Sequence, residues 1–243
     1  MVELNKIFCC DNLSFLKNLE NNFAKICITS PPYNVGKNTV YKKNNLKYNN
    51  NLDYLDNYYE WLKPRLGEII RISKYTFFNI QMLSANKLTI IKLLSDYQNY
   101  FKDVIIWGKN GQPAMCRGVL NSCFEFIFIF DKETPYKRRF NDVNFRGTVP
   151  NLINFGTNNR NKYSKLHRAQ FPESLPKFII ENFSKEGDIV CDPFAGLGNV
   201  LITAKQMKRN FIGIDIDQEI LQCNRRTIKK FDKSINFSYY QSK

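Results

Sequence analysis

The last quarter of the sequence holds a strand, a glycine-containing turn, a helix and a second strand in close succession. Residues 188–192, DIVCD, have the apolar character of a buried strand, the turn PFAGLG follows, and FIGID at residues 211–215 forms the second strand. Two strands that are joined through a helix lie parallel in one sheet, because the crossover returns the chain to the edge from which it started. This unit, residues 188–217, therefore predicts an α/β fold.

The rest of the chain repeats the alternation. Strands are predicted at residues 6–9, 24–29, 75–80, 102–107, 122–130, 188–191, 211–214 and 236–240, and helices after Asp11 and at residues 56–73, 84–96, 172–182, 198–207 and 218–231. Residues 37–55 are polar and predict a long loop, and residues 132–168 show no clear period. Because 243 residues suffice for one domain with a substantial core, we expect a doubly wound, mainly parallel sheet in a single domain, residues 1–243.

The chain is strongly basic, with a formal net charge of +14 from 36 Lys and Arg against 22 Asp and Glu. Half of this excess lies between Lys132 and Arg168, where nine basic residues stand against two acidic ones. A localised excess favours a surface that binds a polyanion, with a solvated basic face as the alternative.

Several classes of protein are disfavoured by what the sequence lacks. The longest apolar run, residues 126–130, is too short to span a membrane, and the N-terminus has no apolar signal region, so we expect a cytoplasmic protein. Seven cysteines without a C-x-x-C pair, and a single histidine, His167, argue against zinc, so no metal is expected. No Pro-Cys dipeptide occurs, which removes the usual nucleophile of cytosine-C5 methylation.

The turn after Asp192 has the chemistry of a ligand-binding loop. Gly196 and Gly198 allow close approach of the backbone to a ligand, and ligands of open α/β sheets bind at the carboxyl ends of strands. Asp215 ends the next strand, where a carboxylate can accept both hydroxyls of a ribose. Asp192 would repel the pyrophosphate of NAD but suits a cationic ligand. A tight strand–helix turn without a ligand is the alternative.

Six segments resemble the motifs of one enzyme family. ITSPPYNVG at residues 28–36 resembles the catalytic motif of amino-methyltransferases, DPFAGLGN at 192–199 their cofactor motif, and FIGIDID at 211–217 their ribose-binding motif. HRAQFPESLP at 167–176 resembles the segment that closes over the methionine end of the cofactor, and FFNIQ and FEFIFIF resemble the core motifs. With the catalytic motif first and the cofactor motif last, nearly the whole chain resembles the β group of DNA amino-methyltransferases of restriction–modification systems.

This resemblance implies a Rossmann-like S-adenosylmethionine-dependent methyltransferase fold. It implies a catalytic half at about residues 1–131, a small target-recognition insertion at about 132–168 and a cofactor half at about 169–243. It also implies double-stranded DNA as the partner and methyl transfer to an exocyclic base amine after base flipping. Ser at position 30 goes mostly with cytosine N4 in this family, and Asp with adenine N6. N4-cytosine is therefore the prediction and N6-adenine the alternative.

Other hypotheses stay open beside this one. The chain could be a DNA-binding protein that retains the fold without activity, or a nucleotide-dependent oxidoreductase. The resemblance also leaves open a companion endonuclease, a second methyltransferase or a homodimer as partners.

The expected site residues follow from the matched motifs. The catalytic residues are Ser30, Pro31, Pro32 and Tyr33. The cofactor-binding residues are Asp11, Gln170, Phe171, Asp192, Phe194, Gly196, Gly198 and Asp215. The DNA-binding residues are Lys137, Arg138 and Arg139. For Asp11 the alternative is a helix N-cap.

The catalytic motif also has a chemical rationale. An exocyclic base amine is a weak nucleophile, because its lone pair is delocalised into the ring. Ser30 Oγ and the carbonyl of Pro31 can each accept a hydrogen bond from the amine, and two prolines fix the direction of that carbonyl. Tyr33 offers a flat face for stacking an extruded base. The cationic and aromatic residues between Gly36 and Asn51 suggest a loop that closes over this base, with disorder in the absence of DNA as the alternative.

Overall fold

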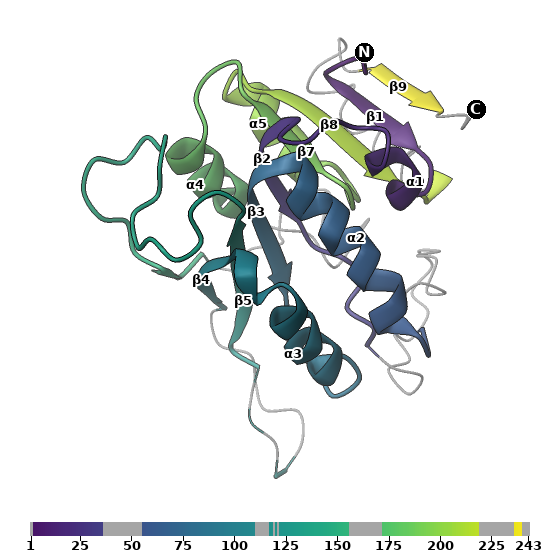
Figure 1. Ribbon diagram of the computed structural model, residues 1–243, viewed down its shortest axis with the longest axis vertical. Coiled ribbons are helices and arrows are strands. Elements are labelled where there is room, and N and C mark those ends of the chain that lie inside the picture. The colour runs from purple at the N-terminus through teal and green to yellow at the C-terminus, as the bar shows by residue number, and fades with distance from the viewer. Residues whose placement is uncertain are drawn as a thin grey trace.

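The computed structural model describes residues 2–35, 55–109, 117–118, 120, 122–155 and 172–218, and the backbone of 236–239. In this part of the chain, nine strands form one sheet in the order β6-β4-β5-β3-β2-β7-β8-β1-β9 (Figure 1). The strands are β1 Lys6–Cys9, β2 Ala24–Thr29, β3 Ser73–Ile80, β4 Phe101–Gly108, β5 Phe124–Asp131, β6 Leu152–Ile153, β7 Ile189–Asp192, β8 Asn210–Asp215 and β9 Asn236–Tyr239. Only β5 runs antiparallel to its neighbours among these strands, so the prediction of a mainly parallel sheet is confirmed.

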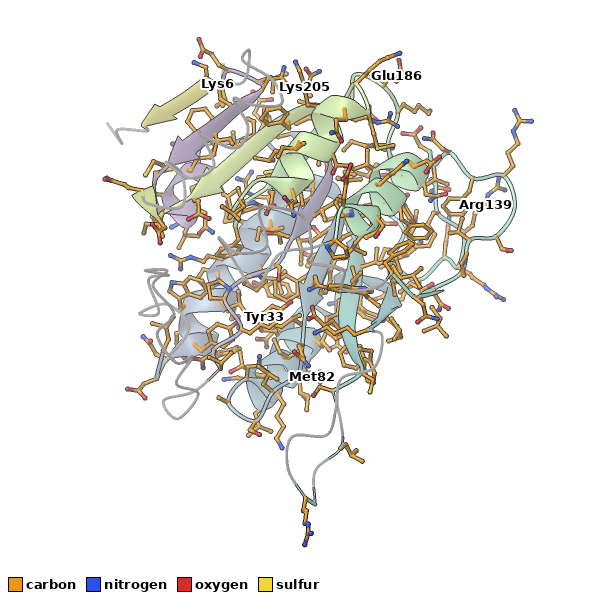
Figure 2. All side chains as sticks on the ribbon, turned by 180° about the vertical axis from the view of Figure 1, so that it is seen from behind. Lys6, Tyr33, Met82, Arg139, Glu186 and Lys205 are labelled. Atoms are coloured by element: carbon orange, nitrogen blue, oxygen red, sulfur yellow. The ribbon has the colours of Figure 1, made fainter. Side chains whose placement is uncertain are left out.

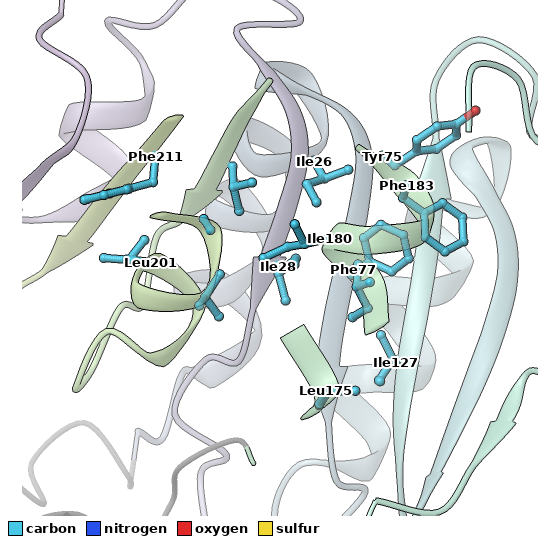
Figure 3. Close-up of a cluster of buried hydrophobic side chains, with 14 of the residues drawn as sticks. Ile26, Ile28, Tyr75, Phe77, Ile127, Leu175, Ile180, Phe183, Leu201 and Phe211 are labelled. Carbon is cyan, nitrogen blue, oxygen red and sulfur yellow. The ribbon is translucent and has the colours of Figure 1, made fainter. Parts of the chain in front are cut away.

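Helices cover both faces of the sheet. They are α1 Asn12–Leu16, α2 Tyr58–Ile72, α3 Lys87–Asp96, α4 Ser174–Phe183 and α5 Asn199–Gln206, with a short 3₁₀ helix η2 at Gln98–Tyr100. Alternate side chains of β2 point to opposite faces, as a strand requires. Ile26 and Ile28 pack in the cluster beneath α4 and α5 (Figure 3), whereas Cys27 packs in the cluster beneath α1 and α2. The sheet is therefore doubly wound.

Most predicted elements lie within a few residues of their predicted positions. The exceptions have local causes. The predicted helix at residues 84–96 begins only at Lys87, because the Asn86 side chain accepts a hydrogen bond from the Leu83 backbone (2.7 Å) and holds these residues in a turn. The segment predicted to be irregular contributes β6, a two-residue strand at the sheet edge. Most of the predicted loop at 37–55 and most of the predicted helix at 218–231 lie outside the described residues. No described helix is long and apolar enough to cross a membrane.

The centre of the sheet is the point where the winding direction changes. Strands β2 and β7 are neighbours, but β2 leads through α2 to β3 on one side, whereas β7 leads through α5 to β8 on the other. The loops that follow two such strands move apart and leave a crevice at their carboxyl ends, which is where open α/β sheets bind ligands. The two loops with predicted functions follow these two strands.

Candidate active site

The catalytic and cofactor loops begin side by side at this switch point. Thr29, the last residue of β2, donates its hydroxyl to the carboxylate of Asp192, the last residue of β7, over 2.9 Å. The residue after Thr29 is Ser30, so the serine lies beside the cofactor loop. The structure therefore brings together the two motifs that the sequence places more than 160 residues apart.

The catalytic loop is held by its backbone carbonyls. The Tyr58 hydroxyl of α2 donates to the Pro32 carbonyl (2.6 Å), and the Asn86 side chain donates to the Tyr33 carbonyl (2.5 Å). Asn34, which has a left-handed backbone with φ of 52°, accepts from the Leu55 backbone N–H (2.7 Å). In the described part of the chain, no group donates to the carbonyl of Pro31. That carbonyl and Ser30 Oγ remain as acceptors at the end of β2.

A set of polar side chains supports Ser30 from behind. Ser30 Oγ lies 3.0 Å from the Tyr33 hydroxyl, which donates to Glu125 Oε2 over 2.6 Å. Asn79 Nδ2 lies 2.6 Å from both the Tyr33 hydroxyl and Glu125 Oε2, and Lys109 forms an ion pair with the other carboxylate oxygen of Glu125. Tyr33 is half-buried and packs against the cluster beneath α2 and α3. Stacking of its ring on a base stays a prediction.

The cofactor loop is fixed by hydrogen bonds to its neighbours. The Gly196 N–H donates to Asp215 Oδ2 over 2.8 Å, and the Phe194 N–H donates to Asp192 Oδ1 over 3.1 Å. Gly196 and Gly198 have φ of 49° and 78°, in the left-handed region that residues with a Cβ disfavour. A Cβ on Gly196 would lie 4.0 Å from the Phe194 carbonyl oxygen, an ordinary contact, so the backbone conformation, rather than crowding, requires glycine there.

Two carboxylates beside this loop, at the ends of β7 and β8, have raised pKa values. Burial raises the pKa of Asp192 to about 7, with a further contribution from the nearby charge of Asp215 and opposition from the hydrogen bonds of Thr29 and Phe194. Burial likewise raises the pKa of Asp215. A cation bound between them would stabilise both in their charged forms.

Asp11 caps α1, as its alternative interpretation predicted, since its Oδ1 accepts from the Ser14 backbone N–H over 3.0 Å. Its Oδ2 accepts from Arg65 of α2 over 2.5 Å. Burial alone would raise the pKa of Asp11, but the Ser14 N–H and the Arg65 guanidinium lower it below its usual range. Arg65 also donates to Asn12, whose amide donates to the Pro193 carbonyl of the cofactor loop (both 2.9 Å). This chain of contacts ties α2 to the cofactor loop.

The three basic residues Lys137, Arg138 and Arg139 lie elsewhere. They follow β5, which runs antiparallel to β3. The carboxyl end of β5 therefore lies beside the beginning of β3, where Asp131 is opposite Tyr75. The seven residues from Glu125 to Asp131 span roughly 20 Å of strand. In Figure 2, Arg139 stands at the periphery, far from Tyr33. The structure therefore places these three residues away from the catalytic loop, and their role as DNA contacts stays a prediction. Gln170 and Phe171 lie outside the described residues.

Sequence reasoning did not find Glu125, Asn79, Lys109, Tyr58, Asn86 or Arg65. A usable indication was present for the first two, since Glu125 and Asn79 are polar residues inside apolar strands, FEFIFIF and FFNIQ. Both are almost fully buried, with 6% and 1% of their surfaces exposed. Buried polar groups need partners, so polar residues in predicted core strands are candidates for a site.

Taken together, the geometry defines an α/β protein with two ligand loops at one crevice, one rich in hydrogen-bond acceptors and one that suits a cation with a ribose. The family model described as DNA methylase, for N6 and N4 enzymes, matches residues 24–226. The chain therefore belongs to the N6/N4 DNA methylase family, and the order of its motifs places it in the β group.

Individual relatives agree with this assignment. The chain is 33% identical over 236 residues to the Type II methyltransferase M.HpaI of Haemophilus parainfluenzae, which covers 89% of this chain and 72% of that protein. Among solved structures, the PvuII DNA methyltransferase (cytosine-N4-specific) has a TM-score of 0.71 at 16% identity and covers 96% of this chain and 91% of its own. The M1.HpyAVI–SAM complex has a TM-score of 0.60 at 23% identity and covers 91% and 98%. At these identities, the two structures show a shared fold.

Proposed function

We propose that this protein transfers a methyl group from S-adenosylmethionine to the exocyclic N4 amine of cytosine in duplex DNA, as the modification enzyme of a restriction–modification system. The observation that carries the proposal is the Thr29–Asp192 hydrogen bond, because it joins a loop that offers acceptors to an amine with a loop that suits a cationic cofactor. M.HpaI bears the name of a Type II methyltransferase, and one structure of similar fold is named as a complex with SAM, which supports both the reaction class and the methyl donor.

The residues present fit this cofactor. When bound, S-adenosylmethionine supplies a methyl group on a positively charged sulfur. Asp192, whose buried carboxylate has a pKa near 7, would hold the cationic end, and Asp215 would accept the ribose hydroxyls. Gly196 and Gly198 would let the loop backbone approach the cofactor closely, and Phe194 would pack against it.

The catalytic loop prepares the base amine. Ser30 Oγ and the Pro31 carbonyl each accept a hydrogen bond from one N–H of the amine. These two hydrogen bonds raise the electron density on the nitrogen and direct its lone pair at the methyl group. No covalent bond between protein and base is needed, so positioning and exclusion of water would account for the rate. Tyr58 and Asn86 contribute by fixing the neighbouring carbonyls of Pro32 and Tyr33.

The target amine is inferred from one residue. Ser30 stands where a carboxylate would be expected for adenine N6, and the PvuII enzyme of similar fold is described as cytosine-N4-specific. The test is to express the protein in a host that lacks DNA methylation, hydrolyse the DNA and identify the methylated nucleoside by mass spectrometry. N4-methylcytosine supports the proposal. N6-methyladenine overturns the choice of base, and absence of both overturns the enzymatic function.

Cofactor affinity should depend on pH through Asp192. Its pKa is raised to about 7 in the free protein, so below that pH the carboxyl group is protonated and must lose its proton to hold a cation. We expect the Kd for S-adenosylmethionine to be constant above pH 8 and to rise by up to about tenfold per pH unit below pH 7. Calorimetry in two buffers of different ionisation enthalpy measures the proton released on binding. A Kd that is constant between pH 5.5 and 8 would contradict the role of Asp192.

The position of Lys137, Arg138 and Arg139 leads to a further prediction. If DNA contacts only the side of the sheet that carries the catalytic loop, the triple variant Lys137→Gln, Arg138→Gln, Arg139→Gln should change the Kd for DNA by less than about twofold at 0.15 M salt, since charges beyond a Debye length of about 8 Å are screened. The matched comparison is Lys42→Gln, Lys43→Gln, Lys47→Gln, in the segment that the sequence predicts to close over the base. Tenfold weaker binding by the first variant, measured by fluorescence anisotropy, would show that DNA reaches this edge of the sheet.

A further inference from the structure

The side chains behind Ser30 form a chain of hydrogen bonds that ends on a buried anion. Glu125 is the second residue of β5, at the end of this strand that lies beside the catalytic loop. Only 6% of its surface is exposed. Its carboxylate receives the Tyr33 hydroxyl, the Asn79 amide and the Lys109 ammonium. Such a convergence of donors is what a buried carboxylate requires.

Counting protons gives this chain a direction. The Tyr33 hydroxyl has one proton, and Glu125 Oε2, which has none, lies 2.6 Å away, so Tyr33 donates to Glu125. Burial, and then the charge of Glu125, raise the pKa of Tyr33 well above its usual range, so this proton stays on the tyrosine. The 3.0 Å contact between Ser30 Oγ and the Tyr33 oxygen must then use the serine proton.

Building on the proposed function, we propose that Glu125 and the Tyr33 hydroxyl are positioning residues that hold the Ser30 proton away from the base, so that Ser30 meets the substrate amine only as an acceptor. A serine hydroxyl without such a partner could instead donate its proton in a hydrogen bond to the base. In that orientation the serine proton would point at the amine hydrogens, and Ser30 Oγ could not accept from them. With its proton committed to Tyr33, both lone pairs of Ser30 Oγ can accept. Linked donation toward an anion also strengthens each oxygen as an acceptor.

The contacts of Asn79 indicate that these polar side chains stabilise the Glu125 carboxylate rather than only filling space in the core. The amide nitrogen of Asn79 donates to both Tyr33 and Glu125, whereas its oxygen is buried with no partner in the described part of the chain. A buried amide that leaves its acceptor unpaired gives up stability. An uncharged, apolar cluster at this place would avoid that penalty.

The test compares single-turnover rates of methyl transfer to DNA at saturating cofactor. We expect Tyr33→Phe and Glu125→Gln each to lower the rate about tenfold, the size of one hydrogen bond of about 1.4 kcal/mol, with the Kd for DNA and for S-adenosylmethionine unchanged. The double variant should be no slower than the slower single variant, because both break one chain. Tyr75→Phe is the matched control, since its hydroxyl bonds to the Asn141 carbonyl at the opposite edge of the sheet (2.6 Å), and it should keep the wild-type rate.

Three outcomes decide the matter. If Tyr33→Phe transfers methyl groups as fast as Tyr75→Phe, the inference is wrong. This outcome decides the question even if the Glu125→Gln variant does not fold. If the two losses multiply in the double variant, Tyr33 and Glu125 act separately and the inference is also wrong. If the wild-type protein transfers no methyl group to DNA of any sequence, the proposed function fails, and this inference fails with it.

Discussion

Replacing Asp192 with Asn is expected to weaken binding of S-adenosylmethionine at least about a hundredfold and, at the same time, to stabilise the cofactor-free protein. Asn keeps an oxygen that can accept from Thr29 and from the Phe194 N–H, so the loop geometry is retained while the charge is removed. The affinity falls because a buried carboxylate facing a cation contributes about 3 kcal/mol or more.

The gain in stability follows from the sign of the pKa shift. Because the folded-state pKa of Asp192 is raised to about 7 from an ordinary value of 3.8, the stability of the cofactor-free protein falls as pH rises through this window. Above pH 7 the buried charge costs on the order of 4 kcal/mol. Part of that returns in the Asn variant, less the cost of burying its amide, so a net gain of about 1–3 kcal/mol is expected.

For a chain of this size, such a gain raises Tm by several degrees, at about 2–4 °C per kcal/mol. Thermal unfolding at pH 8 and pH 5 measures it, and the gain should be larger at pH 8. The matched control is Asp188→Asn, at the residue before the first residue of β7, where the side-chain carboxylate accepts from the Lys185 backbone N–H over 2.7 Å. Unchanged cofactor affinity in Asp192→Asn would remove this residue from the cofactor site.

The elements that sequence predicted well are those with local causes. The run AKICIT is apolar and stops at two prolines, so β2 could be placed without any knowledge of its neighbours. Asp11 was predictable as a cap, because a carboxylate before a helix satisfies free N–H groups of the first turn. The rule that ligands bind at the carboxyl ends of strands in open α/β sheets predicted the turn after Asp192 as a ligand-binding loop.

The parts that sequence missed depend on strand direction and on contacts over long separations. Tyr33 and Glu125 touch across 92 residues, and although Glu125 is conspicuous as a polar residue in an apolar strand, nothing in the local sequence identifies Tyr33 as its partner. The position of Lys137, Arg138 and Arg139 depends on β5 being antiparallel. A parallel strand with the same sequence would have delivered them to the catalytic edge, since the pattern of apolar residues is the same in both directions.

The second large effect is expected for Ser30→Ala, which should slow methyl transfer about 10- to 150-fold and leave cofactor affinity unchanged. As the methyl group transfers, the amine nitrogen becomes positively charged, and a hydrogen bond from it to Ser30 Oγ becomes charge-assisted, worth about 1.5–3 kcal/mol. The Pro31 carbonyl remains as the second acceptor, so some activity should survive.

Single-turnover rates and separate measurement of the Kd for cofactor distinguish this from loss of binding. Ser30→Thr is the matched control, because it keeps the hydroxyl beside Tyr33 and should retain more activity than Ser30→Ala. If Ser30→Ala transfers methyl groups at the wild-type rate, the amine is not held by this residue. The argument from serine to cytosine N4 would then lose its structural basis, because it requires Ser30 to touch the reacting nitrogen.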